Sequence, residues 1–508
     1  MTMFHLRLVR SIALLTLGSI LTTSCLPGAN IPGSSPGQNN NTSVAKVDDT
    51  IISCETIPAQ NSSRNNSVLN IEIHVDGSGS MLGYATVPNS RYIKTLEAVD
   101  QTFSLSSIIP TESVKVNYFR TGFNKSDSKS LHPLDRSLFQ RARSAEFYTG
   151  VGNSNFPPIS SQVNKAIESL DSDVNKLIVL ISDMGQDDGD VTRILQSIRN
   201  NVFLSKETKK TNAALAIVGI KSEFDGKVHS PTNPTQSYPY STLGKPTDSY
   251  RPFYLLIAGP ASNVQYFLDK LETSIKSLIP DIFQVVNSSD LDQNQSTIEA
   301  SLFDINLLPA LTFQNTIVES KRVKNIQEVY ALRNRNLALR LSSESNSKAL
   351  IITTNQPISQ NYKVSLFNNN LDSQDRELGN LVVPSSLVAE SSIQTFDPST
   401  GTFLEATENS PIILNSLNFK FLNPLELSFD LQISPADLIT ENIYVYKVRF
   451  RAKELTQHDW WTEWDTSEEQ NWNQGNKTYK LFNFLTGLNS LTSGFMETGE
   501  LCYAIQRK

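Results

Sequence analysis

Three short, almost entirely apolar runs most constrain what this chain can fold into. They are KLIVLIS (176–182), AALAIVGI (213–220) and FYLLIAG (253–259). A run of this kind fits a strand that is covered on both faces, as in a parallel sheet under helices. Segments of helical spacing follow at 190–201 and 261–279. Strands that alternate with helices predict a doubly wound, Rossmann-like α/β sheet.

The same alternation begins earlier, with strand-like residues 68–76 and helical spacing at 91–108, so we expect one α/β domain over 67–282. Beyond it the pattern changes to short strands. LELSFDLQI (425–433) and IYVYKVRFRA (443–452) alternate apolar and polar residues, which predicts antiparallel sheet with one face in water. We therefore expect β-rich, sandwich-like domains over 283–424 and 425–508.

The N-terminus has the pattern of an export signal. Two arginines precede an apolar stretch that is too short to span a bilayer comfortably, and small residues lead to Cys25. The sequence LTTSC resembles a bacterial lipobox, in which the cysteine carries the lipid. We expect a signal peptide at 1–24 and a lipid-anchored, Gly/Pro/Asn-rich tether at 25–66. This predicts attachment to a bacterial membrane in the cell envelope, periplasmic or on the surface. Secretion without lipid is the alternative.

The chain has three cysteines. If Cys25 carries lipid, Cys54 and Cys502 remain, and two thiols in an oxidising compartment are candidates for a disulfide. Such a bridge would link the start of the mature chain to its C-terminal domain. Two separate buried thiols are the alternative.

The formal net charge of −7 argues against a nucleic-acid partner, since phosphate binding requires a basic face.

The segment HVDGSGSMLG (74–83) follows the first predicted strand directly. It presents Asp76, Ser78 and Ser80 at D-x-S-x-S spacing, with glycines between them that allow tight turns. Asp183 follows the buried strand KLIVLIS, so both carboxylates are expected at carboxyl ends of neighbouring strands. Carboxylate and hydroxyl oxygens suit a hard cation, Mg²⁺ or else Ca²⁺ or Mn²⁺.

The DGSGSM segment, together with an apolar strand that ends in ISD, resembles the von Willebrand factor A domain and its metal-ion-dependent adhesion site. The resemblance covers about 68–280. It implies a Rossmann-like sheet with Mg²⁺ bound by Asp76, Ser78, Ser80 and Asp183. It also implies adhesion without turnover, in which an acidic side chain of a protein partner completes the metal shell.

The family pattern also includes a Thr from a middle loop before a helix. The segment FYTGVGNSNFPPISSQ offers Thr149 and Ser154. Ser154 lies closer to the following helix and is our choice, with Thr149 as the alternative.

Two aromatic groups are open to more than one interpretation. Tyr238, Tyr240 and Tyr250 lie in a long Pro-rich segment, 222–252, which either contacts a partner near the metal or is a packed surface loop. All four tryptophans lie within HDWWTEWDTSEEQNW (458–472), where packing is expected more often than sugar or protein recognition. His74, beside the site, is expected to be a neutral packed histidine.

The leading hypothesis is therefore an envelope lipoprotein that binds a protein partner through Mg²⁺. The second is a structural subunit of an envelope complex, without metal-dependent binding. A hydrolase is the third, but the sequence has no HExxH, G-x-S-x-G or P-loop motif, so we expect no enzyme activity.

Overall fold

The computed structural model describes the α/β part of the chain almost completely and the C-terminal part in pieces. Cys25, Cys54 and Ser154 lie outside the described residues, as do the predicted signal peptide and most of the predicted tether. Within the described part, no helix is long and apolar enough to cross a membrane. The described ranges are 49–52, 68–104, 114–149, 155–172, 175–185, 191–204, 213–230, 233, 236–283, 296–305, 326–329, 331–334, 337–341, 347–365, 380–382, 384–397, 399–400, 402–405, 412–414, 420–423, 426–467 and 474–508.

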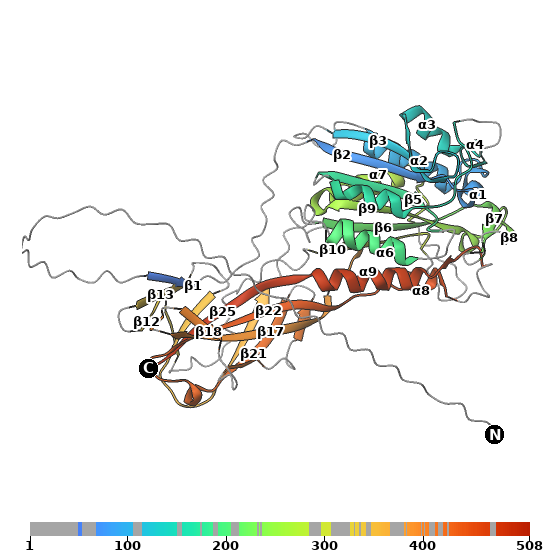
Figure 1. Ribbon diagram of the computed structural model, residues 1–508. Coiled ribbons are helices and arrows are strands. Elements are labelled where there is room, and N and C mark those ends of the chain that lie inside the picture. Colours follow the sequence, from blue (N-terminus) through green and yellow to red (C-terminus); the bar gives the residue numbers. More distant parts are fainter. Residues whose placement is uncertain are drawn as a thin grey trace, which may run out of the picture. The chain divides into compact units, whose positions relative to one another are not determined.

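A mixed eight-stranded sheet forms the centre of the α/β body, the name used here for this sheet and the helices on it (Figure 1). Its most apolar strand, KLIVLIS, is buried along its whole length, because it lies inside the sheet and is covered on both faces. In pairing order the strands are β16 (Asn380–Leu381), β10 (Ile298–Asp304), β6 (Ala213–Ser222), β9 (Arg251–Pro260), β5 (Lys176–Ser182), β2 (Leu69–Asp76), β3 (Val114–Asn124) and β4 (Lys129–Leu134).

The prediction of an α/β sheet is confirmed, but the sheet is only partly parallel, so the doubly wound, Rossmann-like arrangement is not confirmed. Strand β2 pairs in parallel with β3 and β5, but β9 is antiparallel to both of its neighbours, β5 and β6. Between β6 and β9 the described chain forms the hairpin of β7 (Asp225–His229) and β8 (Ser237–Ser241), with no helix crossing a face. A parallel return needs such a crossover, so β9 runs back beside β6 in the opposite direction.

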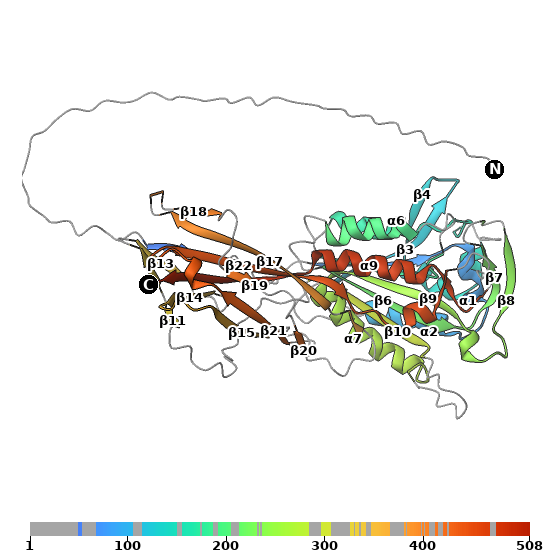
Figure 2. The same cartoon turned by 90° about the horizontal axis from the view of Figure 1, so that it is seen from below.

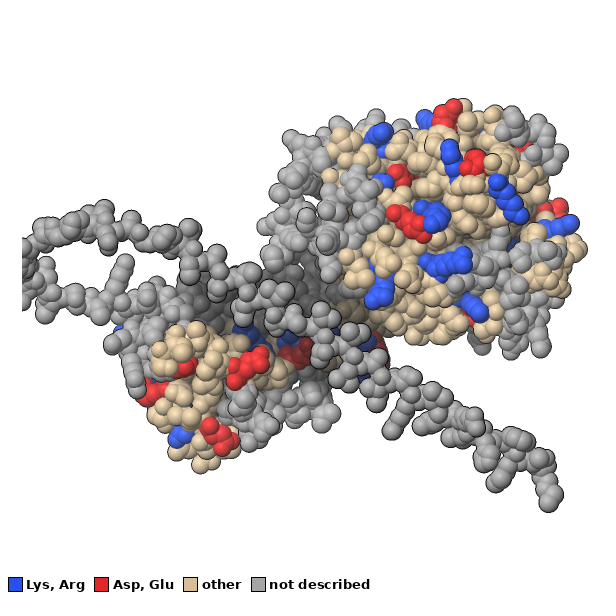
Figure 3. All heavy atoms as spheres, in the orientation of Figure 1, with Lys and Arg blue, Asp and Glu red and all other residues tan. Residues whose placement is uncertain are grey.

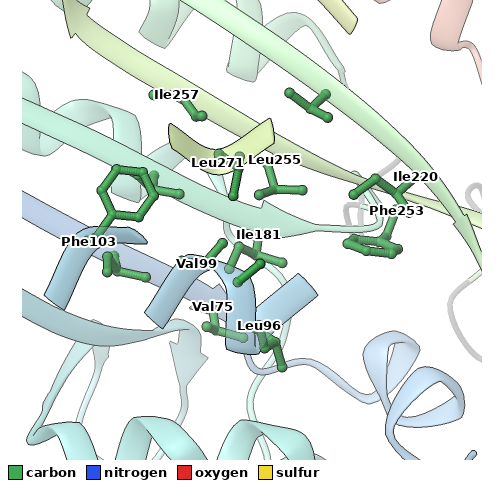
Figure 4. Close-up of a cluster of buried hydrophobic side chains, with 14 of the residues drawn as sticks. Val75, Leu96, Val99, Phe103, Ile181, Ile220, Phe253, Leu255, Ile257 and Leu271 are labelled. Atoms are coloured by element: carbon green, nitrogen blue, oxygen red, sulfur yellow. The ribbon is translucent and has the colours of Figure 1, made fainter. Parts of the chain in front are cut away.

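Helices cover both faces of the sheet. Helices α2 (Arg91–Ser104) and α7 (Ala261–Leu278) cover one face, and their apolar side chains meet those of β2, β5 and β9 (Figure 4). The opposite face is covered by α5 (Asn164–Glu168), α6 (Val191–Ile198) and α9 (Leu481–Phe495). Shorter helices are α1 (Leu82–Ala85), which follows β2, and α3 (Arg136–Gln140) and α4 (Glu146–Thr149), which follow β4.

The α/β body includes residues from far beyond the expected boundary at 282. Strand β10 pairs with β6, and α9 lies beside α6 in both Figures 1 and 2. A Cβ on Gly487 of α9 would lie 2.7 Å from Leu195 Cδ1 of α6. In α8 (Trp460–Glu463), Trp461 donates from Nε1 to Ser301 Oγ at 2.9 Å. The 425–508 region is therefore not entirely β, because the segment between β22 and β25 contributes helices to the sheet's outer layer.

The rest of the C-terminal region consists of further sheets, as expected. The alternating segments form β21 (Glu426–Ile433) and β22 (Ile443–Leu455). The six-stranded sheet has the order β11 (Ile326–Val329), β14 (Ser347–Ile352), β25 (Glu497–Arg507), β22, β17 (Pro384–Asp397) and β18 (Thr402–Glu405). A four-stranded sheet contains β21 with β15 (Ile358–Ser365), β19 (Ile412–Leu414) and β20 (Lys420–Asn423). A three-stranded sheet contains β1 (Asp49–Ile52), β13 (Leu337–Leu341) and β12 (Ala331–Asn334). A two-stranded sheet contains β23 (Asp465–Thr466) and β24 (Thr478–Tyr479).

Cys502 lies on β25, is completely buried and is disulfide-bonded. Cys54 lies outside the described residues, so its pairing with Cys502 stays a prediction. Charged side chains of both signs are interspersed over the described surface of the α/β body on the face drawn in Figure 3.

Candidate metal site

Asp76 is the last residue of β2, and its side chain is completely buried. Because β2 is parallel to both neighbours, its carboxyl end lies beside the ends of β3 and β5. The chain then turns into the short 3-10 helix η1 (Gly79–Met81). This turn lets the backbone N–H of Ser78 donate to Asp76 Oδ1 at 2.9 Å. The predicted first loop is therefore a compact, hydrogen-bonded turn.

The second oxygen of Asp76 accepts two hydroxyl hydrogen bonds. Ser161 Oγ donates to Asp76 Oδ2 at 3.0 Å, and Ser182 Oγ donates to it at 2.8 Å. Ser161 follows an isolated bridge between Ser160 and Phe123, which fixes its loop against the extension of β3. Three separate segments thus converge on one carboxylate.

Asp183 follows β5 and joins the same group through the first loop. Ser78 Oγ and Ser80 Oγ are 3.1 Å apart, and Ser80 Oγ donates to Asp183 Oδ1 at 3.2 Å. The next residue, Met184, has a φ of 61°, a left-handed conformation that non-glycine residues seldom adopt. This turn lets Gly185 N donate back to Asp183 Oδ1 at 3.1 Å.

The two glycines of the motif have different roles, and neither has a positive φ. A Cβ on Gly77 would lie 2.5 Å from Arg120 Nε, so this position must be glycine for the arginine to pack. A Cβ on Gly79 would meet nothing within 4 Å. The absence of a side chain is therefore required for close packing at Gly77 but not at Gly79.

Arg120 joins two of the site loops. Its guanidinium donates to Pro157 O at 2.6 Å and to Gly77 O at 3.0 Å. It also lies over the rings of Phe147 and Phe156, at 5.3 and 5.9 Å from their centroids. Arg120 therefore holds the loop that carries Ser161 against the loop that carries Ser78.

The surroundings of Asp76 disfavour the ionised form of its carboxyl group. Burial, and then the nearby charge of Asp183, raise the pKa of Asp76 to about 6, although hydrogen bonds from Ser78 and Ser182 oppose the shift. A carboxyl group in this state gains from a nearby positive charge, because the charge stabilises its ionised form.

Asp183, by contrast, already has a cationic neighbour. Arg251 Nη2 lies 3.2 Å from Asp183 Oδ2, and its side chain is only 13% exposed. Burial alone would lower the pKa of Arg251, but Tyr84 and Asp183 raise it above its usual value. The guanidinium therefore stays charged beside the site.

The structure brings together four of the five predicted ligands: Asp76, Ser78, Ser80 and Asp183. Ser154 lies outside the described residues and stays a prediction, while Thr149 is the last residue of α4. Ser161 and Ser182 were missed. Ser182 directly precedes Asp183 in the sequence, but no local pattern distinguishes Ser161 from the other serines of its loop.

His74 is a packed histidine, as predicted. It is fully buried, its Nδ1 lies 3.1 Å from Thr121 Oγ1, and its ring stacks on Phe119. Burial lowers its pKa, which favours the neutral form.

The described tryptophans are packing residues. Trp460, Trp461 and Trp464 are all buried, and Trp461 stacks on Phe303. In the tyrosine-rich segment, Tyr240 OH donates to Ser249 O at 2.6 Å, and Arg91 lies over the ring of Tyr250. Contact of this segment with a partner stays a prediction.

Within the described residues, no group of three or more His, Cys, Asp or Glu side chains could hold a metal. The candidate site has two carboxylates, and its other oxygens come from hydroxyl groups. Comparison of the chain with protein-family models, curated proteins and solved structures found no match. Function therefore has to be inferred from the geometry and charge of this site.

Proposed function

We propose that the α/β body is a von Willebrand factor A-like domain that binds a divalent cation and, through it, an acidic protein partner. The observation that carries the proposal is the convergence of Asp76, Ser78, Ser80 and Asp183 at adjoining strand ends. Mg²⁺ is the first choice, and Ca²⁺ and Mn²⁺ are alternatives.

The oxygen spacing fits a cation shell. Oxygens at about 2.1 Å from an octahedral Mg²⁺ are separated by about 3 Å along an edge, and at about 2.4 Å from Ca²⁺ by about 3.4 Å. The spacings from Ser78 Oγ to Ser80 Oγ and from Ser80 Oγ to Asp183 Oδ1 are 3.1 and 3.2 Å. Hard oxygen donors of this kind suit these ions rather than zinc.

The group is partly open to solvent, since Gly79 is exposed and Ser80 is half-buried, whereas Asp76 and Ser78 are buried. When bound, the cation would supply a Lewis-acidic position for a partner carboxylate. Asp76 and Asp183 would balance its charge, and Arg120 would keep the loops in place.

The envelope setting rests on the predicted signal, Cys25 and the tether. A lipid anchor followed by a Gly/Pro-rich spacer would hold the domain away from a membrane and leave it free to meet a partner. We assign no catalytic residue to the chain.

One observation favours the second function, a structural subunit without metal-dependent binding. Asp183 is already bonded by Arg251, Ser80 and Gly185, so its negative charge is balanced without an added ion. In that case assembly would not depend on the cation.

Capture of partners from an envelope extract, in Mg²⁺ and in EDTA, tests the proposal. Asp76→Asn serves as the site variant. Asp135→Asn is the matched control, because Asp135 is the exposed N-cap of α3. We expect capture by the wild type and by Asp135→Asn in Mg²⁺ only, and none by Asp76→Asn. Equal recovery in Mg²⁺ and EDTA would exclude the metal-dependent mechanism and favour the structural subunit.

A further inference from the structure

Arg251 is a charged residue of the site that does not belong to the predicted cation-binding motif. It begins β9, the strand that runs antiparallel to β5, so its side chain reaches the carboxyl end of β5 from the neighbouring strand. Its Nη2 donates to Asp183 Oδ2, whereas Ser80 donates to Asp183 Oδ1. The guanidinium and the proposed cation position therefore face different oxygens of one carboxylate.

The guanidinium is held in place by the fold. Nη1 donates to Gly475 O at 3.2 Å, and the ring of Phe224 lies 5.3 Å from its central carbon. The turn that contains Gly475 is itself fixed, since Thr478 Oγ1 lies 2.7 Å from Tyr254 OH on β9. Nε is buried and has no hydrogen-bond partner. The C-terminal segment thus helps to hold a positive charge beside the metal site.

The charges have a definite consequence. The charges of the two carboxylates and a divalent cation cancel. Arg251 therefore leaves the site with one unit of positive charge in excess, and the positive charge of Arg120 beside Asp76 increases this excess. A like charge a few ångströms away disfavours cation binding, and burial increases the effect. An anion bound at the cation would remove the excess.

We propose, on the basis of the function proposed above, that Arg251 makes cation binding and carboxylate binding cooperative. Alone, the cation binds weakly because the site already holds a guanidinium. With a partner carboxylate in place the excess charge is neutralised, and each ligand strengthens the binding of the other by the same factor. The site then retains its metal chiefly when an acidic partner is present.

Electron paramagnetic resonance of free Mn²⁺ tests this with the full chain, using acetate as the carboxylate probe against chloride at equal ionic strength. Arg251→Gln removes the charge but retains an amide donor, Arg251→Met removes both, and Arg251→Lys retains the charge. Arg91→Met is the control. Arg91 is another buried arginine of the α/β body, and it pairs with Asp281.

We expect Arg251→Gln and Arg251→Met to bind Mn²⁺ about tenfold more tightly than the wild type in chloride. Acetate should tighten Mn²⁺ binding severalfold in the wild type, Arg251→Lys and Arg91→Met, but not in the neutral variants. Circular dichroism and thermal unfolding identify variants that do not fold. If one of the two neutral variants, Arg251→Gln or Arg251→Met, does not fold, the other still provides the test.

Wild-type affinity and an unchanged acetate effect in a folded neutral variant would overturn the role of Arg251 while leaving metal binding intact. Absence of Mn²⁺ binding in both the wild type and the folded neutral variants would instead overturn the proposed function, and the role of Arg251 with it. Binding by the neutral variants alone would support the proposal in its strongest form.

Discussion

Strand β2 holds two carboxylates on the same face of the sheet, the half-buried Glu72 at its middle and the buried Asp76 at its carboxyl end, and their surroundings shift their pKa values in opposite directions. Glu72 lies 2.9 Å from Lys176 Nζ and also meets His74 and Ser169. Burial alone would raise its pKa, but these hydrogen bonds and the charge of Lys176 lower it to about 2. Asp76, at the carboxyl end, is bonded by neutral groups and has a pKa of about 6. Glu72 has a directly bonded counter-charge in Lys176, whereas no cationic group is bonded to Asp76 in the described part of the chain, and we infer that a bound cation takes that place.

The sharpest test of this difference is to neutralise each carboxylate in turn. Asp76→Asn should weaken Mn²⁺ binding by at least about a hundredfold, because loss of an outer-shell partner alone costs about 10- to 100-fold in other metal sites. Glu72→Gln is the matched control on the same strand and should bind as the wild type does. Electron paramagnetic resonance titration measures both, and equal losses would remove the distinction between the two carboxylates.

The free energy of unfolding should be more sensitive to Glu72→Gln than to Asp76→Asn, the reverse of the order expected for Mn²⁺ binding. The lowered pKa of Glu72 corresponds to about 3 kcal/mol, which contact with solvent reduces to about 2 kcal/mol. Glu72→Gln should therefore lower the free energy of unfolding at pH 7 by about 2 kcal/mol. Asp76→Asn in EDTA should not lower it, because the ionised carboxylate is unfavourable there. Urea denaturation of the two variants measures this, and a larger loss for Asp76→Asn would contradict it.

The pH dependence should separate the two groups. The pKa of Glu72 is lowered in the folded state. Its contribution to the free energy of unfolding is therefore present above pH 4.5 and is lost as the pH falls toward about 2. In chelator, Asp76 acts in the reverse direction. Its contribution is present below pH 3.8 and is lost as the pH rises through about 6. Free energies of unfolding measured at a series of pH values test this. Glu72→Gln should remove the loss of stability at low pH, and Asp76→Asn should remove the loss of stability as the pH rises through about 6.

The smallest expected effect concerns the serines that bond each carboxylate. Ser161→Ala removes a hydroxyl from Asp76 and should weaken Mn²⁺ binding by about tenfold. Ser169→Ala removes one from Glu72 and should leave Mn²⁺ binding unchanged. Mn²⁺ titration of both variants decides this, and wild-type affinity in Ser161→Ala would leave Ser161 with a structural role only.

Much of the fold and site could be predicted because the relevant signals are local. The run KLIVLIS is a buried strand, and the alternating segments 425–433 and 443–452 coincide largely with β21 and β22. Asp76 and Asp183 lie together because each directly follows a strand, and β2 and β5 are neighbours.

The direction of β9 was not predictable in this way, because an apolar strand looks the same whether its neighbours run with it or against it. The helices of 460–495 were also missed, since their apolar faces are explained only by the distant sheet that they cover.

The sequence by itself determined which candidate oxygen ligands follow the strands, because D-x-S-x-S and the strand before it are contiguous. Only the tertiary structure decided what surrounds those ligands. Ser161 reaches Asp76 from 85 residues away, and Arg251 reaches Asp183 from 68 residues away. Charge balance in a buried site depends on such distant contacts, since electrostatic interactions act through space and not along the chain.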